Sequence, residues 1–189
     1  MQRVIVITPP ERVVTLDQAK QHLRVDGDDD DALIKAFIDA STAHIDGPDG
    51  WLGKAIGLQT LEAGLDGFIY DPISLPYPPV LTVTGIVYDD IAGVERTLDP
   101  ATYEVRDGAI GTVWGKSWPS TRAYCGASRS VRITYRAGYE TVPAPIVVAI
   151  LMMVGDMYRN RETAGTGGMG AVPMTASVDA LLNPFRVYT

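Results

Sequence analysis

The sequence predicts an α+β protein in which a small helical bundle carries an inserted antiparallel β domain. With 46% hydrophobic residues among 189, the chain can bury a core. Apolar residues recur at helical spacing near the N-terminus and after residue 141, whereas Thr, Val, Tyr, Gly and Pro dominate between about Ile56 and Tyr139. We therefore expect helical residues at 1–55, a β insertion at 56–140, a long bundle helix at 141–164, and a flexible link with a docking segment at 165–189.

Two helices are predicted before the β insertion. Thr15 and Gln18 have the spacing of a capping box, so the first helix begins at Leu16, and Gly27 ends it. The second helix follows four aspartates whose charge complements the helix dipole and whose side chains can cap free N–H groups: Asp28, Asp29, Asp30 and Asp31. Its apolar face comprises Leu33, Ile34, Phe37, Ile38 and Ile45, and the segment from Gly47 to Gly50 ends it.

The insertion is expected to contain five to seven antiparallel strands. Val131, Ile133 and Tyr135 alternate with polar residues, which is typical of a strand with one buried face. Asp107-Gly108 suits a tight primed turn, so Tyr103–Arg106 and Ala109–Val113 are expected to form a hairpin. A more buried strand is predicted over Leu81–Tyr88, after prolines that cannot continue a ladder.

Helical spacing returns after Pro143 and Pro145. Because apolar residues fill every face from Ile146 onward, this third helix is expected to be buried nearly all round until Asp156 and to form the spine of the fold. The Gly-rich stretch Gly165–Gly170 favours a flexible link. Ser177 is expected to cap a final short helix over Val178–Leu182, which Pro184 stops.

Charge and cysteine content narrow the class of protein. A net charge of -7 argues against a protein that coats nucleic acid, since such binding needs Lys and Arg to neutralise phosphates. Cys125 is the single cysteine, so an internal disulfide is excluded. The apolar run Val4–Ile7 is too short for a signal peptide, and Ile146–Val154 is too short for a membrane span. We expect a soluble protein without a membrane partner.

Two motifs resemble ligand sites but fail on their spacing. An EF-hand loop starting at Asp26 would place Asp31 where glycine is needed and Phe37 where the bidentate Glu belongs. Gly165–Gly170 lacks a following Lys-Ser/Thr pair, and Pro173 interrupts the helix that a phosphate loop would need. We therefore expect no metal site and no cofactor.

The sequence contains little material for catalysis. His22 and His44 lie on different predicted helices, and Cys125 has no apparent activating neighbour. Neither a Gly-x-Ser-x-Gly elbow nor a His-Glu-x-x-His pair occurs. A Ser-His-Asp group assembled only in space remains an alternative, but we expect no catalytic residues and hence not an enzyme.

Aromatic residues in the β region allow a different class of function. Trp114 and Trp118, with Tyr124, suit either a platform for sugars or a partner, or the core of the sheet. A small carbohydrate-binding or hydrolytic domain using Asp89, Asp90 and Asp107 is therefore a second hypothesis, although hydrolysis would need paired carboxylates at a suitable separation.

Five large apolar or aromatic residues follow the predicted link. Burial of these apolar side chains is favourable, so we expect the segment to dock on a protein surface. That surface is either its own domain or a neighbouring copy or portal. Both alternatives stay open from sequence. The predicted docking residues are Leu181, Leu182, Phe185, Val187 and Tyr188.

Taken in order, these features resemble the long form of the head-tail connector (adaptor) family of tailed phages, prophages and gene transfer agents. Gly47–Trp51 departs from the family pattern, in which the second helix continues. The resemblance is carried by Thr15–Val25, Ala32-Leu33-Ile34, Gln59-Thr60, Leu75–Val80, Ile133–Tyr139, Val142–Ile146, Tyr158–Glu162 and Val178–Val187.

The resemblance implies a structural virion protein of the neck, assembled in the bacterial host cytoplasm. It implies a ring of about twelve copies beneath the portal protein, joined below to a stopper or tail-terminator protein. DNA would pass through without specific binding, and we expect acidic side chains to line the lumen, because like charge keeps phosphates from sticking. Another neck or tail-completion protein is the nearest alternative.

Overall fold

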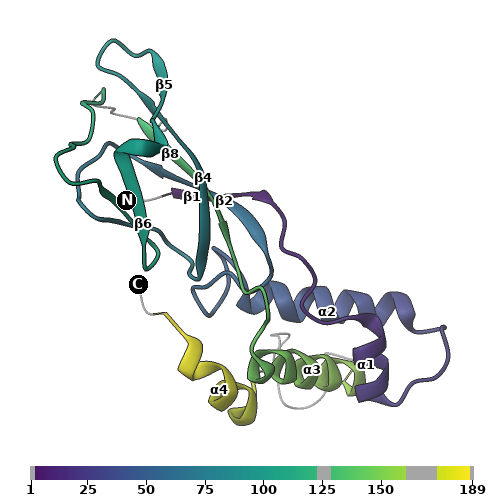
Figure 1. Cartoon of the computed structure of the whole chain (residues 1–189). Coiled ribbons are helices and arrows are strands. Elements are labelled where there is room, and N and C mark those ends of the chain that lie inside the picture. Colours follow the sequence, from purple (N-terminus) through teal and green to yellow (C-terminus); the bar gives the residue numbers. More distant parts are fainter. Residues whose placement is uncertain (1–2, 123–128, 161–173, 188–189) are drawn as a thin grey trace. The chain divides into compact units, whose positions relative to one another are not determined.

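The computed structural model describes residues 3–122, 129–160 and 174–187, and its chain forms two compact units (Figure 1). The β unit comprises the residues up to Pro10 together with Leu58–Gly138. The helical unit comprises Glu11–Gly57 and the residues from Tyr139 onward. Helices and antiparallel sheets are thus both present and segregated, which confirms the predicted α+β class.

The N-terminus differs from the sequence prediction. Strand β1 (Arg3–Thr8) belongs to the β unit, so the assignment of all of residues 1–55 to the helical bundle is wrong at this end. The run Val4–Ile7 is β-branched throughout, which favours extended backbone. A neighbouring strand, β2 (Gln59–Leu65), is available to pair with it.

The first two helices begin and end close to their predicted bounds. Helix α1 (Leu16–Leu23) starts with the capping box: Thr15 Oγ1 accepts from the Gln18 N–H at 3.2 Å, and Gln18 Oε1 accepts from the Thr15 N–H at 2.9 Å. The helix ends before Gly27, because Arg24 already adopts the left-handed conformation at φ 58°. Helix α2 (Asp31–Ile45) ends just before the Gly47–Gly50 break, as predicted.

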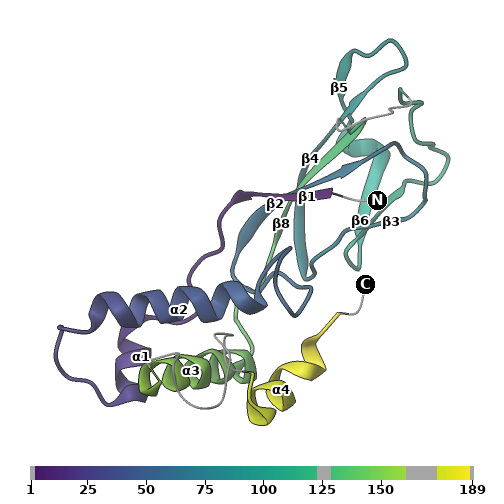
Figure 2. The ribbon, with the colours of Figure 1, turned by 180° about the vertical axis from the view of Figure 1, so that it is seen from behind.

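Helix α3 (Ala144–Arg159) forms the centre of the helical unit and contacts the other three helices. Its buried residues are Ile146, Ala149, Ile150, Met153, Val154 and Gly155. The prediction of burial nearly all round is wrong for one stripe, since Val148 is 44% exposed and Val147, Leu151 and Met152 are half-buried. In both views α2 and α3 lie side by side (Figures 1 and 2).

The last helix, α4 (Ala176–Leu182), continues into a 3-10 turn, η2 (Asn183–Phe185). Thr175, and not the predicted Ser177, occupies its N-cap and accepts from the Val178 N–H at 3.4 Å. The predicted link Gly165–Gly170 lies outside the described residues. No helix within the described residues has the length and apolar content needed to cross a membrane.

The larger sheet of the β unit has the strand order β1-β2-β8-β4-β5. Strand β8 (Val131–Ala137) is its centre, and its alternating burial confirms the predicted half-buried pattern. Strand β4 (Val80–Asp89) is less buried than predicted: of its ten residues only Ile86 is fully buried. The short strand β5 (Glu95–Thr97) pairs only with Val87–Asp89, so among the described strands most of β4 has a neighbour on one side alone.

A smaller sheet has the order β3-β7-β6, comprising β3 (Ile73–Ser74), β6 (Tyr103–Arg106) and β7 (Ala109–Thr112). The predicted hairpin is confirmed: Asp107 and Gly108 have φ of 49° and 76°, the positive values of a primed turn. A 3-10 turn, η1 (Pro100–Thr102), precedes it. The insertion therefore contains seven described strands, β2 to β8, all antiparallel and within the expected range.

Candidate assembly surfaces

The C-terminal segment docks on its own helical unit. Leu182 and Val178 are fully buried in the cluster formed by α1, α2 and α3, and Leu181 and Phe185 pack partly buried against it. Beyond η2, the Val187 N–H donates to the Leu52 carbonyl at 2.9 Å. Within this chain the segment therefore packs in cis, and its docking on a neighbouring copy or portal stays a prediction.

Arg186 adds a second anchor to this docked segment. Its guanidinium lies 4.1 Å from the centroid of the Trp51 ring, a cation–π contact. Because Leu182 is fully buried in its own subunit, it has no surface left for a partner. Tyr188, the last of the predicted docking residues, lies outside the described residues.

The aspartate run before α2 is held by a lysine of α1. Lys20 Nζ lies 2.7 Å from Asp28 Oδ1 and 2.8 Å from Asp31 Oδ1. The hydrogen bond from Lys20 lowers the pKa of Asp28, and the bonds to Asp28 and Asp31 raise the pKa of Lys20. The run thus fastens the α1–α2 turn to α1.

The predicted side-chain cap of α2 is not made. Asp30 occupies the N-cap position, yet its carboxylate accepts no hydrogen bond from the helix N-terminus. Its Oδ2 instead accepts from the Tyr158 hydroxyl at the end of α3. Asp31 lies in the first turn, where its charge complements the helix dipole, and Asp28 and Asp29 are exposed.

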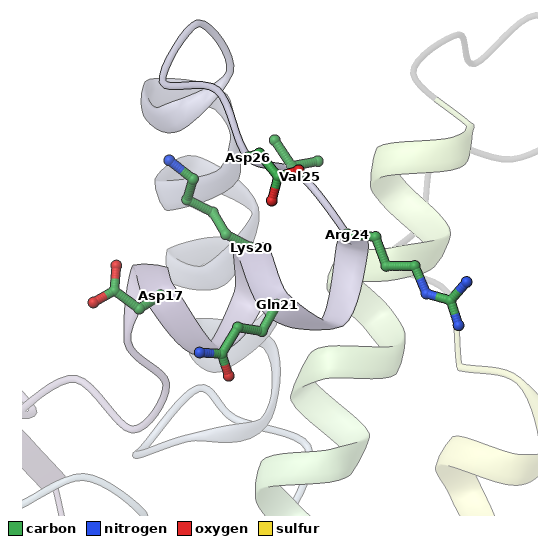
Figure 3. A pocket seen from close by; sticks show the side chains of 6 residues that line it. All are labelled: Asp17, Lys20, Gln21, Arg24, Val25 and Asp26. Carbon is green, nitrogen blue, oxygen red and sulfur yellow. The ribbon is translucent and has the colours of Figure 1, made fainter.

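A surface hollow of about 490 Å³ lies against α1 (Figure 3). Its lining mixes both signs of charge, and the Arg24 side chain points away from the others (Figure 3). Lys20 is already neutralised by two carboxylates outside the lining. The hollow therefore presents no converging set of polar groups; its lining residues are Asp17, Lys20, Gln21, Arg24, Val25 and Asp26.

The two candidate platform tryptophans have different environments. Trp118 stacks on Phe68, with ring centroids 4.8 Å apart and planes 3° from parallel, and Phe68 meets Tyr88 edge-on. Trp114 is 99% exposed at the tip of a turn closed by the hydrogen bond from Lys116 N–H to the Val113 carbonyl. Trp118 thus serves packing and Trp114 faces solvent, while Tyr124 lies outside the described residues.

Three of the polar residues considered for catalysis, Asp90, Asp107 and His22, have structural roles. Asp90 Oδ1 accepts from the N–H groups of Ala92 and Val94 at 2.9 Å each. The Val94 bond above all lowers the pKa of Asp90. Asp107 forms the hairpin turn, and His22 packs on Gly155 of α3, where an added Cβ would lie 3.4 Å from its Nε2. Among the described residues, no three His, Cys, Asp or Glu side chains are grouped to hold a metal ion.

Apart from Trp114, sequence reasoning missed the exposed apolar side chains of the β unit. Of the ten large hydrophobic residues exposed in the described chain, Val148 alone belongs to the helical unit. The four β-branched residues at Val4–Ile7 indicate a strand, but they do not indicate that this strand lies at the edge of a sheet. The nine in the β unit are Ile5, Val6, Ile7, Ile69, Tyr70, Ile91, Val94, Val105 and Trp114.

Solved structures share this fold over the whole chain. A chain from the "Neck of empty GTA particle computed with C6 symmetry" matches with a TM-score of 0.75 and 22% identity, covering 99% of this chain and 96% of that chain. A chain from the "Virion of native gene transfer agent (GTA) particle" gives 0.74 and 23%, covering 98% and 96%. One from the "Neck of native GTA particle computed with C12 symmetry" gives 0.69 and 22%, covering 100% and 96%.

The sequence itself matches one family model. No curated protein matches the chain. Residues 13–79, which include α1, α2 and β2, match the model described as "Phage gp6-like head-tail connector protein". The family match and the structural matches together confirm the resemblance that we inferred from the sequence. Residues 13–79 thus resemble the phage gp6-like head-tail connector family in sequence, and the whole chain shares its fold with chains from gene transfer agent necks.

Proposed function

We propose that the chain is a structural subunit of a virion neck. Copies form a ring of about twelve beneath the portal protein, join it to the tail-side stopper or tail terminator, and surround the DNA exit path. The observation that carries this proposal is the combination of a connector family match at residues 13–79 with a whole-chain fold like that of neck chains solved with C6 and C12 symmetry.

The surfaces described above fit assembly better than turnover. The helical unit closes its core with its own C-terminal helix, and the β unit leaves nine large apolar side chains exposed. Contiguous exposed apolar surface marks sites of protein association, and three of the nine side chains, Ile5, Val6 and Ile7, are consecutive in strand β1. A subunit with such a strand suits a ring in which each copy has fixed neighbours.

Acidic side chains of the helical unit are proposed to face the DNA path. That unit has fourteen acidic and eight basic residues, and Asp26, Asp28 and Asp29 stand exposed in the α1–α2 turn. Negative charge repels phosphates, so DNA slides past without binding. Changing Asp26 and Asp29 to Lys should make assembled rings retain DNA at low salt, whereas Asp49→Lys serves as a control. A ring structure lined continuously by Lys and Arg would contradict this orientation.

Electron microscopy tests the proposed function directly. The purified protein is imaged alone and after mixing with portal rings from the same particle type. We expect rings in at least one of the two samples, and in the mixture we expect density on the tail-facing side of the portal. Monomers in both samples, with no portal binding in a pull-down, would refute the proposal.

A further inference from the structure

One edge of the five-stranded sheet is open and apolar. Strand β1 pairs with β2 on one side and with no other strand among the described residues. Ile5 and Val6 are each 43% exposed and Ile7 is 52% exposed. Edge strands of soluble proteins are ordinarily protected by charged residues, proline, shortness or β-bulges. The stretch Val4–Ile7 contains no charge and no proline, and the register of β1 is irregular only at its end, between Val6 and Thr8, so its edge is suited to pairing with another chain.

Strand β1 is apolar on both of its faces. In the register with β2, Val4 lies opposite Ala63 and Val6 opposite Leu61, and both β2 residues are fully buried. Ile5 lies opposite Glu62, on the other face of the sheet. A strand added next to β1 would therefore cover apolar side chains on both faces and occupy the outward N–H and C=O groups.

A second open edge occurs on the opposite side of the same sheet. Strand β5 pairs with Val87–Asp89, and the Leu98 N–H donates a hydrogen bond to the Ile86 carbonyl at 2.8 Å. Within the described chain, the earlier part of β4 (Val80–Gly85) pairs only with β8. Thr82 and Thr84 are exposed there, and a Cβ added at Gly85 would meet nothing within 4 Å.

These two edges match each other in length. Strand β1 has six residues, and the open part of β4 runs over the six positions 80–85, with register irregularities at Val80/Thr82 and Val83/Gly85. By contrast β5 has three residues, all exposed, and its Glu95 and Arg96 are engaged in ion pairs with Arg132 and Asp90. The edge that β5 covers is thus protected, while β1 and Val80–Gly85 are left as two open edges of similar length.

We propose that β1 of one copy pairs with the Val80–Gly85 edge of β4 in the next copy, so that the sheet continues from subunit to subunit around the ring. This inference rests on the proposed function, because a closed ring of more than two copies needs two different surfaces that fit each other. Pairing of β1 with another β1 would be isologous and would stop at a dimer. The occupant of the open β1 edge is therefore a second copy of this chain.

Substitutions at either edge test the pairing. The β1 variant combines Ile5→Lys with Ile7→Lys, and the β4 variant combines Thr82→Lys with Gly85→Lys; each places charge in the proposed seam. Association of copies should weaken at least about 30-fold in either variant, the loss expected when one central interface anchor is removed. Ile91→Lys is the matched control, because Ile91 is 76% exposed in the same unit but lies on neither edge.

Mixing the two variants makes the test specific. The β1 variant keeps an intact β4 edge and the β4 variant keeps an intact β1, so an equimolar mixture should give heterodimers and no rings. Sedimentation velocity and negative-stain images, with and without portal rings, report both outcomes. Circular dichroism melting checks that each variant is folded, and if one edge does not tolerate Lys, the other edge carries the test.

The results separate this inference from the proposed function. If the wild type forms rings and both edge variants form them equally well, the strand pairing is refuted while the connector function stands. If an equimolar mixture shows no heterodimer although each variant is folded, the pairing of these two edges is likewise refuted. If the wild type forms no ring either alone or on a portal, the proposed function fails.

Discussion

The two units of this chain differ in how they treat charge and apolar surface. The helical unit has fourteen acidic and eight basic residues, against nine and eight in the β unit. Its core takes in residues from all four helices, and it exposes one of the ten large hydrophobic side chains found exposed in the described chain. The β unit exposes the other nine, over strands and loops.

This contrast indicates a division of labour. A unit that completes its own core and carries surplus negative charge is suited to form a rigid, soluble scaffold. A nearly neutral unit with exposed apolar strands is suited to association, since burial of that surface is the main favourable term when proteins assemble. The sequence left open whether the C-terminal segment docks in cis or on a partner, and the exposed apolar side chains make the β unit our proposed site of association.

The largest expected effect tests whether the helical unit is self-contained. Leu182 is fully buried in its own subunit, so Leu182→Ala should lower the free energy of unfolding by about 2–5 kcal/mol. Leu181→Ala is the matched control and should cost less, because Leu181 is only half-buried. Urea unfolding of the monomer measures both. An unchanged midpoint for Leu182→Ala would show that α4 docks elsewhere.

A second experiment contrasts packing and exposure inside the β unit. Trp118→Ala removes the stack on Phe68 and should cost roughly 2 kcal/mol of stability, about half the value for a fully buried aromatic. Trp114→Ala should change stability by less than about 0.5 kcal/mol, since its side chain is 99% exposed. Thermal melting compares the two variants. A large loss for Trp114→Ala would contradict the assignment of that residue to a free surface.

A third experiment examines how α3 is tied to the α1–α2 turn. Tyr158→Phe removes the hydroxyl that donates to Asp30, a hydrogen bond to a charged acceptor. The variant should lose about 1–2 kcal/mol in urea unfolding. Tyr70→Phe, at a side chain that is 70% exposed, should be neutral and serves as the control. Equal stability of both variants would mean that the Tyr158 contact contributes nothing.

The smallest effect concerns the ion pairs of Lys20 and depends on pH. The pKa of Asp28 is lowered in the folded protein, so its contribution is present above the unfolded value near 3.8 and is lost as the pH falls through the folded pKa. The stability difference between wild type and Lys20→Met should therefore be present at pH 6 and shrink below about pH 4. Melting curves across this range measure it. A difference that grows on acidification would contradict the assigned contact.

Local signals explain what the sequence predicted well. The capping box at Thr15, the Asp107-Gly108 turn and the alternation of Val131, Ile133 and Tyr135 each depend on neighbours within a few residues. The helices α2 and α3 are long and strongly periodic, so their existence follows from the pattern of apolar residues.

The remaining features depend on contacts between distant segments. The β-branched run Val4–Ile7 favours a strand, but its pairing with Gln59–Leu65 is a long-range contact that the local pattern does not reveal. Likewise, Asp30 turns from its own helix to Tyr158, 128 residues away. Burial of Leu182 and exposure of Val148 both follow from which faces of α3 the other helices cover. The candidate surfaces could therefore be identified only from the fold, whereas the fold class could be predicted from the sequence.

Hydrogen exchange in the monomer and in the assembled ring tests the central claim most directly. If the β unit provides the contacts between copies, assembly should slow exchange of the backbone amides of β1 and of Val80–Gly85, while the amides of α4 exchange alike in both states. New protection confined to α3 and α4, with β1 unchanged, would contradict the division of labour between the two units.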